Sequence, residues 1–377
     1  MAFISSYNMS YFIFFLMLSS FLLSPSFAST TTICPFESIY QFGDSISDVG
    51  NLIREGPAGA RSYAARYPYG ETFFGRATGR CSNGLLMIDY FALALRLPFL
   101  NPYLGGPNMA FDHGANFAVA GSTALPPSFF MERNIHVPST DNHLKVQLNW
   151  FHAHLNSTCQ TSADCRKRLQ RALVFMGEIG GNDYNYAFFQ GKPIDEIRTY
   201  VPHVVREITD AVREVIQAGA IRIVVPGNFP IGCIPIYLTS FPSSDPRSYD
   251  DMQCLGGLNE FAMFHNDYLQ GALEQLRQEY PHAVIIYGDY YTAFQSVIRR
   301  APSLGFERTS LMKACCGIGG PYNYDGSRMC GSPGVPVCPN PDQHIHWDGV
   351  HLTQGAYRHM ADWLLNDLLP RKVQCVW

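Results

Sequence analysis

The sequence predicts a single α/β domain in which a parallel sheet is covered by helices on both faces. Short apolar runs, most of them rich in β-branched or aromatic residues, end at glycine-bearing turns and are typical of buried strands. Longer segments with helical spacing lie between these runs, and strands that alternate with helices form parallel sheets with right-handed crossovers. No convincing linker divides the chain, so we expect one domain over residues 29–377.

Five segments are predicted to form the strands of this sheet. In chain order they are Ile39–Phe42, Asn116–Ala120, Ala172–Met176, Ile221–Val225 and Ala283–Tyr287. Such sheets place their sites at the carboxyl ends of the strands, so the turns that follow the strands are expected to carry the chemistry. These turns are Gly43–Ser45, Gly121–Ser122 and Gly180–Asp183.

Four longer segments are predicted to be helices. They are Leu85–Leu97, Ile194–Ala218, Met252–Glu279 and Gln354–Leu369. In the second of these, apolar residues recur on one helical face from Ile197 to Ile216. Thr353 is a suitable N-cap for the last helix. Residues 242–247 and 317–341 are expected to be long loops within the domain.

Composition and charge exclude several classes of protein. The chain has 377 residues, of which 47% are hydrophobic and 15% charged, and this mixture can bury a large core instead of remaining disordered. The formal net charge is −4, and the sequence has no basic stripe to neutralise phosphates, so no nucleic-acid partner is expected. No feature of the sequence indicates an oligomeric state.

The N-terminal segment predicts entry into the secretory pathway. Residues 1–28 carry no charged side chain, Tyr11–Leu23 is a largely apolar stretch, and Ser26 and Ala28 are small residues at the −3 and −1 positions of a cleavage site. We therefore expect a signal peptide over residues 1–28 and an extracellular or vacuolar protein. The stretch is too short for a stable membrane anchor, which needs about 20 residues. Asn156 begins a glycosylation sequon, which agrees with this route.

The first motif with catalytic potential follows the first predicted strand and reads Phe42-Gly-Asp-Ser-Ile-Ser-Asp48. A serine at a strand-to-helix turn is exposed, and its backbone N–H can point into the site, as a serine nucleophile requires. The alternative is an ordinary turn, because Gly, Asp and Ser are common there for backbone reasons. The Gly-x-Ser-x-Gly elbow of α/β-hydrolases does not occur in the chain. Ser45 is thus the candidate nucleophile.

The second motif pairs an aspartate with a histidine just before the last predicted helix. Asp348 and His351 are three residues apart, and a turn at Gly349 allows them to meet. The carboxylate then accepts from Nδ1–H and fixes the tautomer, so that Nε2 can take a proton from serine. The alternative is that Asp348 caps a turn and His351 packs on the helix.

A third requirement is a set of donors for the oxyanion of an ester's tetrahedral intermediate. Gly121, after the second predicted strand, offers an unobstructed backbone N–H. Asn182 offers a side-chain amide after the third strand. Each also has an ordinary structural interpretation, because glycine and asparagine are both tolerated in turns.

Together these segments resemble the SGNH hydrolase superfamily, and specifically the plant GDSL esterase/lipases. Four blocks carry the resemblance, and they begin at Phe42, Gly114, Gly180 and Asp348. The resemblance implies a flavodoxin-like three-layer α/β/α sandwich with a five-stranded parallel sheet. It implies Ser45 as nucleophile and first oxyanion donor, with Gly121 and Asn182 as the other two donors. It also implies His351 as base and Asp348 as the carboxylate that orients it.

Local sequence places the resemblance in the branch of acetylajmalan and sinapine esterases. The segments concerned are Gly177–Gly180, Ala314–Gly317 and Arg80–Asn83. Within that branch the expected disulfide pairs are Cys34–Cys81, Cys159–Cys165, Cys233–Cys254 and two among Cys315, Cys316, Cys330 and Cys338. Cys375 would remain unpaired. Spacing alone does not fix this connectivity.

Three alternative functions remain open at this point. A metal hydrolase would use imidazole and carboxylate ligands, which suit zinc or iron. Its candidate residues are His344, His346, Asp348 and His351, with His152 and His154 as a second pair. No further ligand set is predicted, so we expect no metal or other cofactor. The second alternative is an acyltransferase on the same triad, and the third is a non-catalytic carbohydrate- or lipid-binding protein.

The loops after the second, third and fourth strands predict an apolar pocket near Ser45. Their large apolar residues are Phe129, Phe130, Met131, Tyr184, Tyr186, Phe188, Phe189, Phe229, Ile231, Ile234 and Ile236. We therefore expect a small-molecule partner, a medium-sized hydrophobic ester such as an acetylated alkaloid or a phenolic ester. A lipase acting on longer acyl chains is the alternative substrate class.

Overall fold

The computed structural model describes residues 36–371, and five parallel strands in this part of the chain form one sheet in the order β2-β1-β3-β4-β5. The strands are β1 (Ser38–Phe42), β2 (Gly114–Asn116), β3 (Ala172–Met176), β4 (Arg222–Pro226) and β5 (Val284–Gly288). Every residue of β1 to β4 is buried, as expected for strands covered on both faces. The predicted parallel five-stranded sheet is confirmed.

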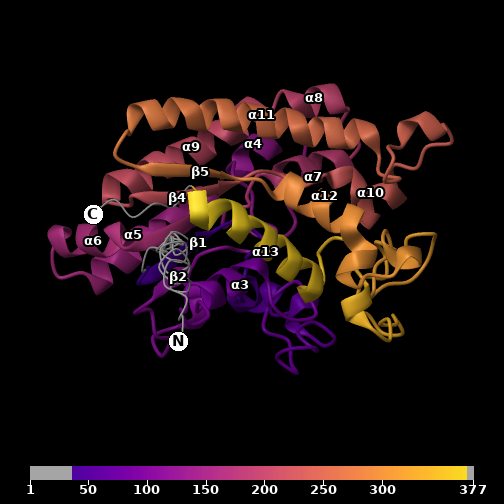
Figure 1. Cartoon of the computed structure of the whole chain (residues 1–377), viewed down its shortest axis with the longest axis horizontal. Helices are drawn as coiled ribbons and strands as arrows, with labels where there is room; N and C mark the ends of the chain where they lie inside the picture. Colours follow the sequence, from indigo (N-terminus) through magenta and orange to yellow (C-terminus); the bar gives the residue numbers. More distant parts are fainter. Residues whose placement is uncertain (1–35, 372–377) are drawn as a thin grey trace, which may run out of the picture. The chain divides into compact units, whose positions relative to one another are not determined.

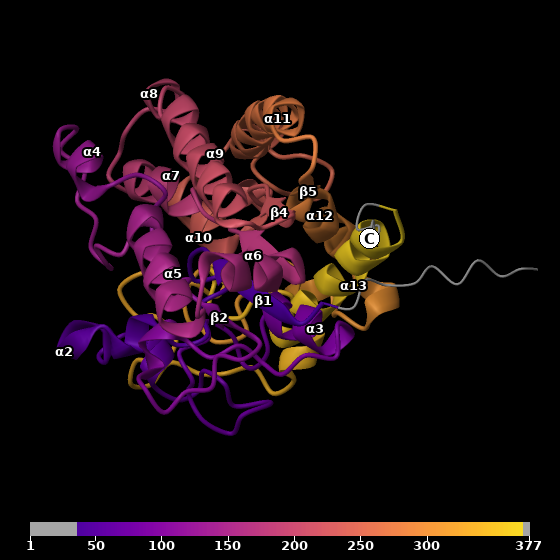
Figure 2. The same ribbon diagram turned by 90° about the vertical axis from the view of Figure 1, so that its left-hand side faces the viewer.

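Helices cover both faces of this sheet (Figures 1 and 2). On one face α9 packs against α11, α5 and α6, and on the other α13 packs against α3 and α12. These helices are α3 (Met87–Ala94), α5 (Leu144–Thr158), α6 (Ser162–Gln170), α9 (Val201–Ala218), α11 (Gly256–Glu279), α12 (Tyr290–Arg300) and α13 (Gln354–Arg371). The strand order reverses after β1, and right-handed crossovers then place helices on opposite faces. The predicted three-layer sandwich is confirmed.

Shorter helices lie in the loops between these layers. They are α2 (Gly56–Gly59), α4 (Pro127–Met131), α7 (Gly181–Phe189), α8 (Ile194–Arg198) and α10 (Pro235–Ser240). None of the helices within residues 36–371 combines the length and apolarity needed to cross a membrane. The predicted signal peptide, residues 1–28, lies outside the described residues.

The second strand begins and ends earlier than predicted. Asn116–Ala120 was the expected strand, but only Gly114–Asn116 pairs with β1. From Asn116 onward, a side chain bonds the backbone carbonyls. Asn51 Nδ2 donates to the carbonyl oxygens of Asn116 and Ala118 at 2.8 Å each. The run is buried, which explains its strand-like composition. The N–H groups of Phe117 and Val119 still donate to backbone carbonyls at residues 41 and 43, but a side-chain amide occupies the carbonyls of the run.

The predicted helix Ile194–Ala218 is two helices, α8 and α9. Pro202 lies in the first turn of α9. A proline inside a continuous helix would clash with the carbonyl four residues earlier, here that of Arg198, where α8 ends. The apolar face of α9 is buried as predicted, from Val201 to Ile216. The predicted N-cap of α13 is also confirmed, because Thr353 Oγ1 accepts the N–H of Ala356 at 3.2 Å.

Candidate active site

Ser45 lies in the turn after β1, where the carboxyl ends of the strands meet. The preceding Gly43 has φ of 145°, and a Cβ there would lie 2.7 Å from the carbonyl oxygen of Glu178, so this close approach requires glycine. Asp44 shapes the turn, because its Oδ1 accepts the N–H of Ile46 at 2.9 Å. The backbone N–H of Ser45 has no partner among residues 36–371 and is free to bind an anion.

Gly121 is held beside this turn by a buried carboxylate. Asp48 Oδ2 accepts the N–H of Ala120 at 2.9 Å, which ties the loop after β2 to the loop after β1. Gly121 has φ of 83°, and a Cβ there would lie 2.3 Å from that of Ser139, so only glycine fits. Within the described part of the chain, its N–H is a second donor without a partner.

Asn182, in the first turn of α7, supplies the third predicted donor. Its Nδ2 donates to Asp44 Oδ2 at 3.0 Å and to the carbonyl oxygen of Ser122 at 2.9 Å. Both amide hydrogens therefore face protein acceptors. To hold an oxyanion, Asn182 must share or release one of these two hydrogen bonds.

Two buried carboxyl groups sit next to this donor. The side chain of Glu178 hydrogen-bonds that of Asp44. Burial raises the pKa of Asp44 to about 6, and burial together with the neighbouring Asp44 raises the pKa of Glu178 well above its ordinary value. Glu178 is thus protonated near neutral pH. Its hydroxyl donates a hydrogen bond to Asp44, which in turn accepts a hydrogen bond from Asn182.

His351 and Asp348 meet as predicted. His351 Nδ1 lies 2.8 Å from Asp348 Oδ2, and the same oxygen accepts the hydroxyl of Tyr69 at 2.8 Å. Asp348 Oδ1 accepts the backbone N–H groups of Val350 at 2.9 Å and His351 at 2.7 Å. Burial alone would raise the pKa of Asp348, but His351 and these hydrogen bonds lower it to about 2. The carboxylate is therefore ionised and accepts from Nδ1–H, which leaves Nε2 for proton transfer.

The charge of His351 depends on this carboxylate. Burial lowers the pKa of His351, but the adjacent Asp348 carboxylate opposes it, and the net result is a pKa well above the usual 6.5. The neighbouring thiol of Cys81 adds no charge near neutral pH, because burial raises its pKa. Asp348 thus makes His351 a stronger base.

Ser45 and His351 line one cavity of about 370 Å³. Gly121, Asn182 and Asp348 line it as well, so the structure brings all five predicted site residues together. In the described part of the chain, Ser45 Oγ and His351 share no hydrogen bond. Such bonds are often long without substrate and tighten when it binds.

The predicted apolar wall of the cavity is confirmed in part. Six of the predicted residues line it: Tyr186, Phe189, Phe229, Ile231, Ile234 and Ile236. Phe130, Tyr184 and Phe188 are instead buried in the core. Met131 is 71% exposed, and Phe129 packs on Tyr200. Aromatic composition identified the loops but not the direction in which each side chain points.

The predicted Cys34–Cys81 disulfide is wrong, because Cys81 is a free thiol. It is buried, lines the cavity and lies near His351. Cys34 and Cys375 lie outside the described residues. The expected pairs Cys159–Cys165 and Cys233–Cys254 are confirmed. The four cysteines whose pairing was left open form Cys315–Cys338 and Cys316–Cys330. The spacing of the cysteines in the sequence does not reveal that Cys81 lies near His351.

Alkylation is expected to label Cys81 in denatured, unreduced protein and to leave it largely unlabelled in native protein at neutral pH. The thiolate is the reactive form, and both the raised pKa and the burial of Cys81 disfavour it. Peptide mass spectrometry after iodoacetamide treatment makes the measurement. Cysteines such as Cys233 and Cys254 serve as controls, because they should react only after reduction. A disulfide-linked peptide that contains Cys81 would contradict the assignment.

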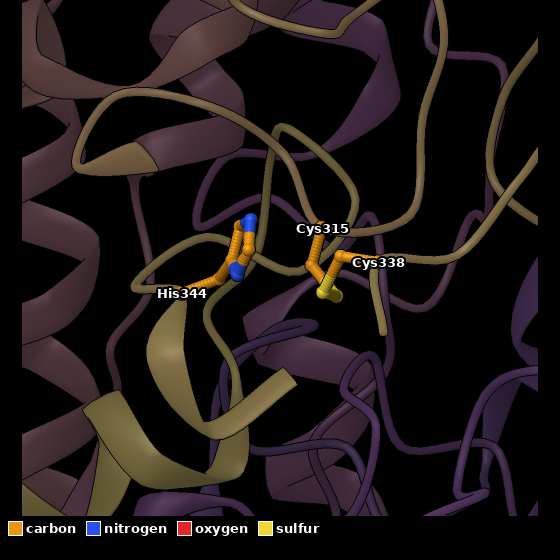
Figure 3. Close-up of side chains that lie close together, drawn as sticks. All are labelled: Cys315, Cys338 and His344. Carbon is orange, nitrogen blue, oxygen red and sulfur yellow. A yellow bond between two sulfur atoms is a disulfide. The ribbon is translucent and has the colours of Figure 1, made fainter. Parts of the chain in front are cut away.

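The candidate metal ligands do not converge. In residues 36–371 the structure brings one set of three possible ligands within 4.8 Å of one another, Cys315, Cys338 and His344. Figure 3 shows that the two sulfur atoms form a disulfide, so they offer no thiolates. His152 pairs with Glu214 at 2.7 Å, away from the buried His154. The ring nitrogens of His346 are buried and have no hydrogen-bond partner in the described chain.

Asn156, the predicted glycosylation site, lies in the last turns of α5 with an exposed side chain. Its position leaves room for a glycan. The modification itself stays a prediction.

Several residues that position the candidate site were not predicted from the sequence. Gln147 on α5 brackets Gly43: its Oε1 accepts the Gly43 N–H at 2.9 Å, and its Nε2 donates to the Gly43 carbonyl at 2.8 Å. The helical spacing of Leu144, Leu148 and Phe151 is a signal that could have placed Gln147 on a buried face. Tyr69 and Glu178 left no comparable signal, because their partners are distant in the sequence.

Comparisons with known proteins agree with this geometry. A family model described as GDSL-like lipase/acylhydrolase matches residues 39–364. The chain is 53% identical over 340 residues to acetylajmalan esterase of Rauvolfia serpentina, which covers 89% of this chain and 87% of that protein. It is 51% identical over 356 residues to a GDSL esterase/lipase of Arabidopsis thaliana, covering 94% of this chain and 96% of the other. The matched region includes both Ser45 and His351.

Proposed function

The chain belongs to the GDSL-like lipase/acylhydrolase family and is a carboxylic ester hydrolase, and from this premise we propose that it works through an acyl-enzyme on Ser45. One observation carries the proposal. His351 is bonded at 2.8 Å to the ionised Asp348 and faces the same cavity as Ser45 and two unpartnered backbone N–H groups. These are the parts that a serine esterase requires.

The reaction then proceeds in two halves. His351 Nε2 takes the hydroxyl proton of Ser45, and Oγ forms a bond to the ester carbonyl carbon. The bond from that carbon to the alcohol oxygen breaks, and His351 gives its proton to the departing alcohol. Water, deprotonated by the same imidazole, attacks the carbonyl carbon of acyl-Ser45. The bond from that carbon to Oγ breaks, His351 returns its proton to Oγ, and the acid leaves. Asp348 keeps its negative charge throughout and stabilises the imidazolium that forms in each half.

The oxyanion of each tetrahedral intermediate is held by three donors. The backbone N–H groups of Ser45 and Gly121 have no partner among the residues that the structure describes, and the amide of Asn182 joins them by sharing a hydrogen now directed at Asp44 or Ser122. Donors fixed before the reaction stabilise charge without a cost of reorganisation. Asp44, backed by the protonated Glu178, fixes the Asn182 amide in place.

The cavity supports a hydrophobic ester of moderate size as substrate. Its walls are mostly apolar and its volume is about 370 Å³. No lysine or arginine of residues 36–371 lines it, whereas the carboxylates of Asp44 and Asp348 do, so the site suits neutral or cationic molecules rather than anionic ones. An acetylated alkaloid or a phenolic ester fits this description, and relatives of the chain are named acetylajmalan esterases.

We further propose that the protein passes through the secretory pathway. The predicted signal peptide over residues 1–28 supports this route, as do the four disulfide bonds of the described chain, which form in oxidising compartments. The destination is extracellular or vacuolar, and Asn156 is the proposed glycan site.

A panel of esters tests the proposed substrate class. We expect kcat/KM for aryl and alkaloid acetates to exceed that for long-chain acyl esters by at least about tenfold, because the cavity holds only about 370 Å³ and is lined by aromatic side chains. Each reaction is run with and without an added alcohol, and the free acid and any new ester are quantified by mass spectrometry. A preference for long acyl chains would contradict the substrate class. A new ester as the main product would identify an acyltransferase.

A further inference from the structure

Asn228 contributes an unusual polar group to the cavity of the candidate active site. It follows β4 by two residues, its side chain is 3% exposed, and it lines the cavity. Its Nδ2 is buried and makes no hydrogen bond to any residue that the structure describes. The mechanism proposed above gives this residue no role.

The orientation of Asn228 is fixed by its surroundings. The carboxamide of Asn266 on α11 brackets its backbone: Oδ1 accepts the Asn228 N–H at 2.7 Å, and Nδ2 donates to the Asn228 carbonyl at 3.0 Å. The preceding Gly227 makes this bracket possible, because a Cβ there would lie 2.3 Å from the hydroxyl of Tyr287. The loop therefore presents Asn228 in one defined position.

The free group of Asn228 must be a donor. Its own Oδ1 accepts the backbone N–H of Phe229 at 2.9 Å. Turning the amide over would place its NH₂ group against this N–H, so the hydrogen-bond network assigns the two atoms. Nδ2 is consequently left as a buried N–H donor without a hydrogen bond to any described residue. A buried donor without a partner is costly and calls for a ligand that satisfies it.

The sheet places this donor away from the bond that is cleaved. Ser45 follows β1 and Asn228 follows β4, and β3 lies between these strands. Neighbouring strands are about 4.8 Å apart, so the two loops are separated by about 10 Å along the edge of the sheet. Asn228 is thus too distant to be a fourth oxyanion donor and faces a more remote part of a bound molecule.

We propose that Asn228 Nδ2 is a specificity-determining donor that binds a second, uncharged oxygen of the ester substrate, several bonds from the scissile carbonyl. The acceptor is an ether, hydroxyl or carbonyl oxygen. An anionic group is disfavoured, because the carboxylates of Asp44 and Asp348 line the same cavity and no lysine or arginine of the described chain does. The apolar side chains beside Asn228, among them Phe229 and Ile231, surround the carbon skeleton that carries this oxygen. The inference rests on the proposed function and names a feature of its substrate.

Binding measurements on inactive protein test the subsite without relying on turnover. In the Ser45→Ala protein, dissociation constants are measured by calorimetry for acetates of linear alcohols and for phenyl esters of linear acids. In each series one CH₂ at a time is replaced by an ether oxygen, at increasing distance from the ester. At one position we expect the ether to be favoured over its hydrocarbon parent, and this preference should fall about tenfold in Ser45→Ala/Asn228→Leu.

Two further variants make the result unambiguous. Asn228→Asp retains the acceptor for the Phe229 N–H and replaces the NH₂ donor by a carboxylate oxygen, so the preference should fall there too, even where the leucine variant is destabilised. Ile236→Val changes the apolar wall of the same cavity and should preserve the preference within about twofold. A preference that is absent at every position, or that survives both Asn228 variants, overturns the subsite.

The outcome for the subsite is separable from that for the proposed function. Wild-type protein that hydrolyses aryl acetates but shows no Asn228-dependent preference in binding overturns the subsite alone. A preference that depends on Asn228 supports the subsite even if Ser45→Ala retains wild-type activity, a result that would contradict the proposed nucleophile.

Discussion

Ser45→Ala is expected to lower kcat for an aryl acetate by about 10⁶-fold, because removing the nucleophile of such a triad removes the acyl-enzyme path altogether. The effect should appear in kcat rather than in substrate binding, since the cavity walls and the two backbone donors remain. Steady-state kinetics measure the loss, and electrospray mass spectrometry of enzyme mixed with a slow ester should show an acyl adduct on the wild-type protein alone.

Ser47→Ala is the matched control for this experiment. It removes a hydroxyl from the same turn, and Ser47 is buried with its backbone N–H bonded to the carbonyl of Asp44. Its activity should stay close to that of the wild type. A Ser45→Ala protein that retains more than about 1% of the wild-type rate would show that another group is the nucleophile, since a removed nucleophile costs far more than that.

Asp348→Asn is expected to lower kcat by about 10⁴-fold, as an amide at this position favours the wrong imidazole tautomer. It should also move the pH profile in a defined direction. Activity requires neutral His351, so kcat/KM of the wild type rises as the pH increases through the His351 pKa, which Asp348 holds well above 6.5. Without the carboxylate, burial remains and lowers the pKa, so the ascending limb of the residual activity should shift to lower pH.

Rates measured from about pH 5 to pH 10 report this shift, provided that folding is checked across the range. Asp195→Asn makes the same change on a carboxylate whose side chain is 90% exposed, and it should leave both rate and profile unaltered. An ascending limb at the same pH in wild type and Asp348→Asn would mean that Asp348 does not set the basicity of His351.

The sheet was predictable because each strand is a short apolar run bounded by a glycine-bearing turn. Where this signal failed, side chains had taken over part of the backbone pairing: residues 117–120 are as buried as a strand, but the amides of Asn51 and Asn116 bond the carbonyl and the N–H of Ala118. The helix α7 was not predicted. Its sequence, Gly181–Phe189, is rich in Asn and Tyr, which have low helix propensity, so packing rather than propensity stabilises it.

The candidate site was predictable where its residues belong to short sequence motifs or follow predicted strands. Asp348 and His351 meet across one turn, and the ends of β1, β2 and β3 bring Ser45, Gly121 and Asn182 to the same cavity. The catalytic roles of these residues stay predictions. Contacts between distant segments were not predictable, because no periodicity or spacing links, for example, Tyr69 to Asp348.

One glutamine and one asparagine side chain fix the backbone at the edge of the sheet where the candidate active site lies. Gln147 bonds both backbone groups of Gly43, and Asn266 bonds both backbone groups of Asn228. In each case a carboxamide bonds both the N–H and the carbonyl of a residue just past the end of β1 or β4, as the peptide unit of a strand would. The loops that carry Ser45 and Asn228 are therefore held in place by side chains of α5 and α11. The surface loops can vary in length and composition without displacing either residue.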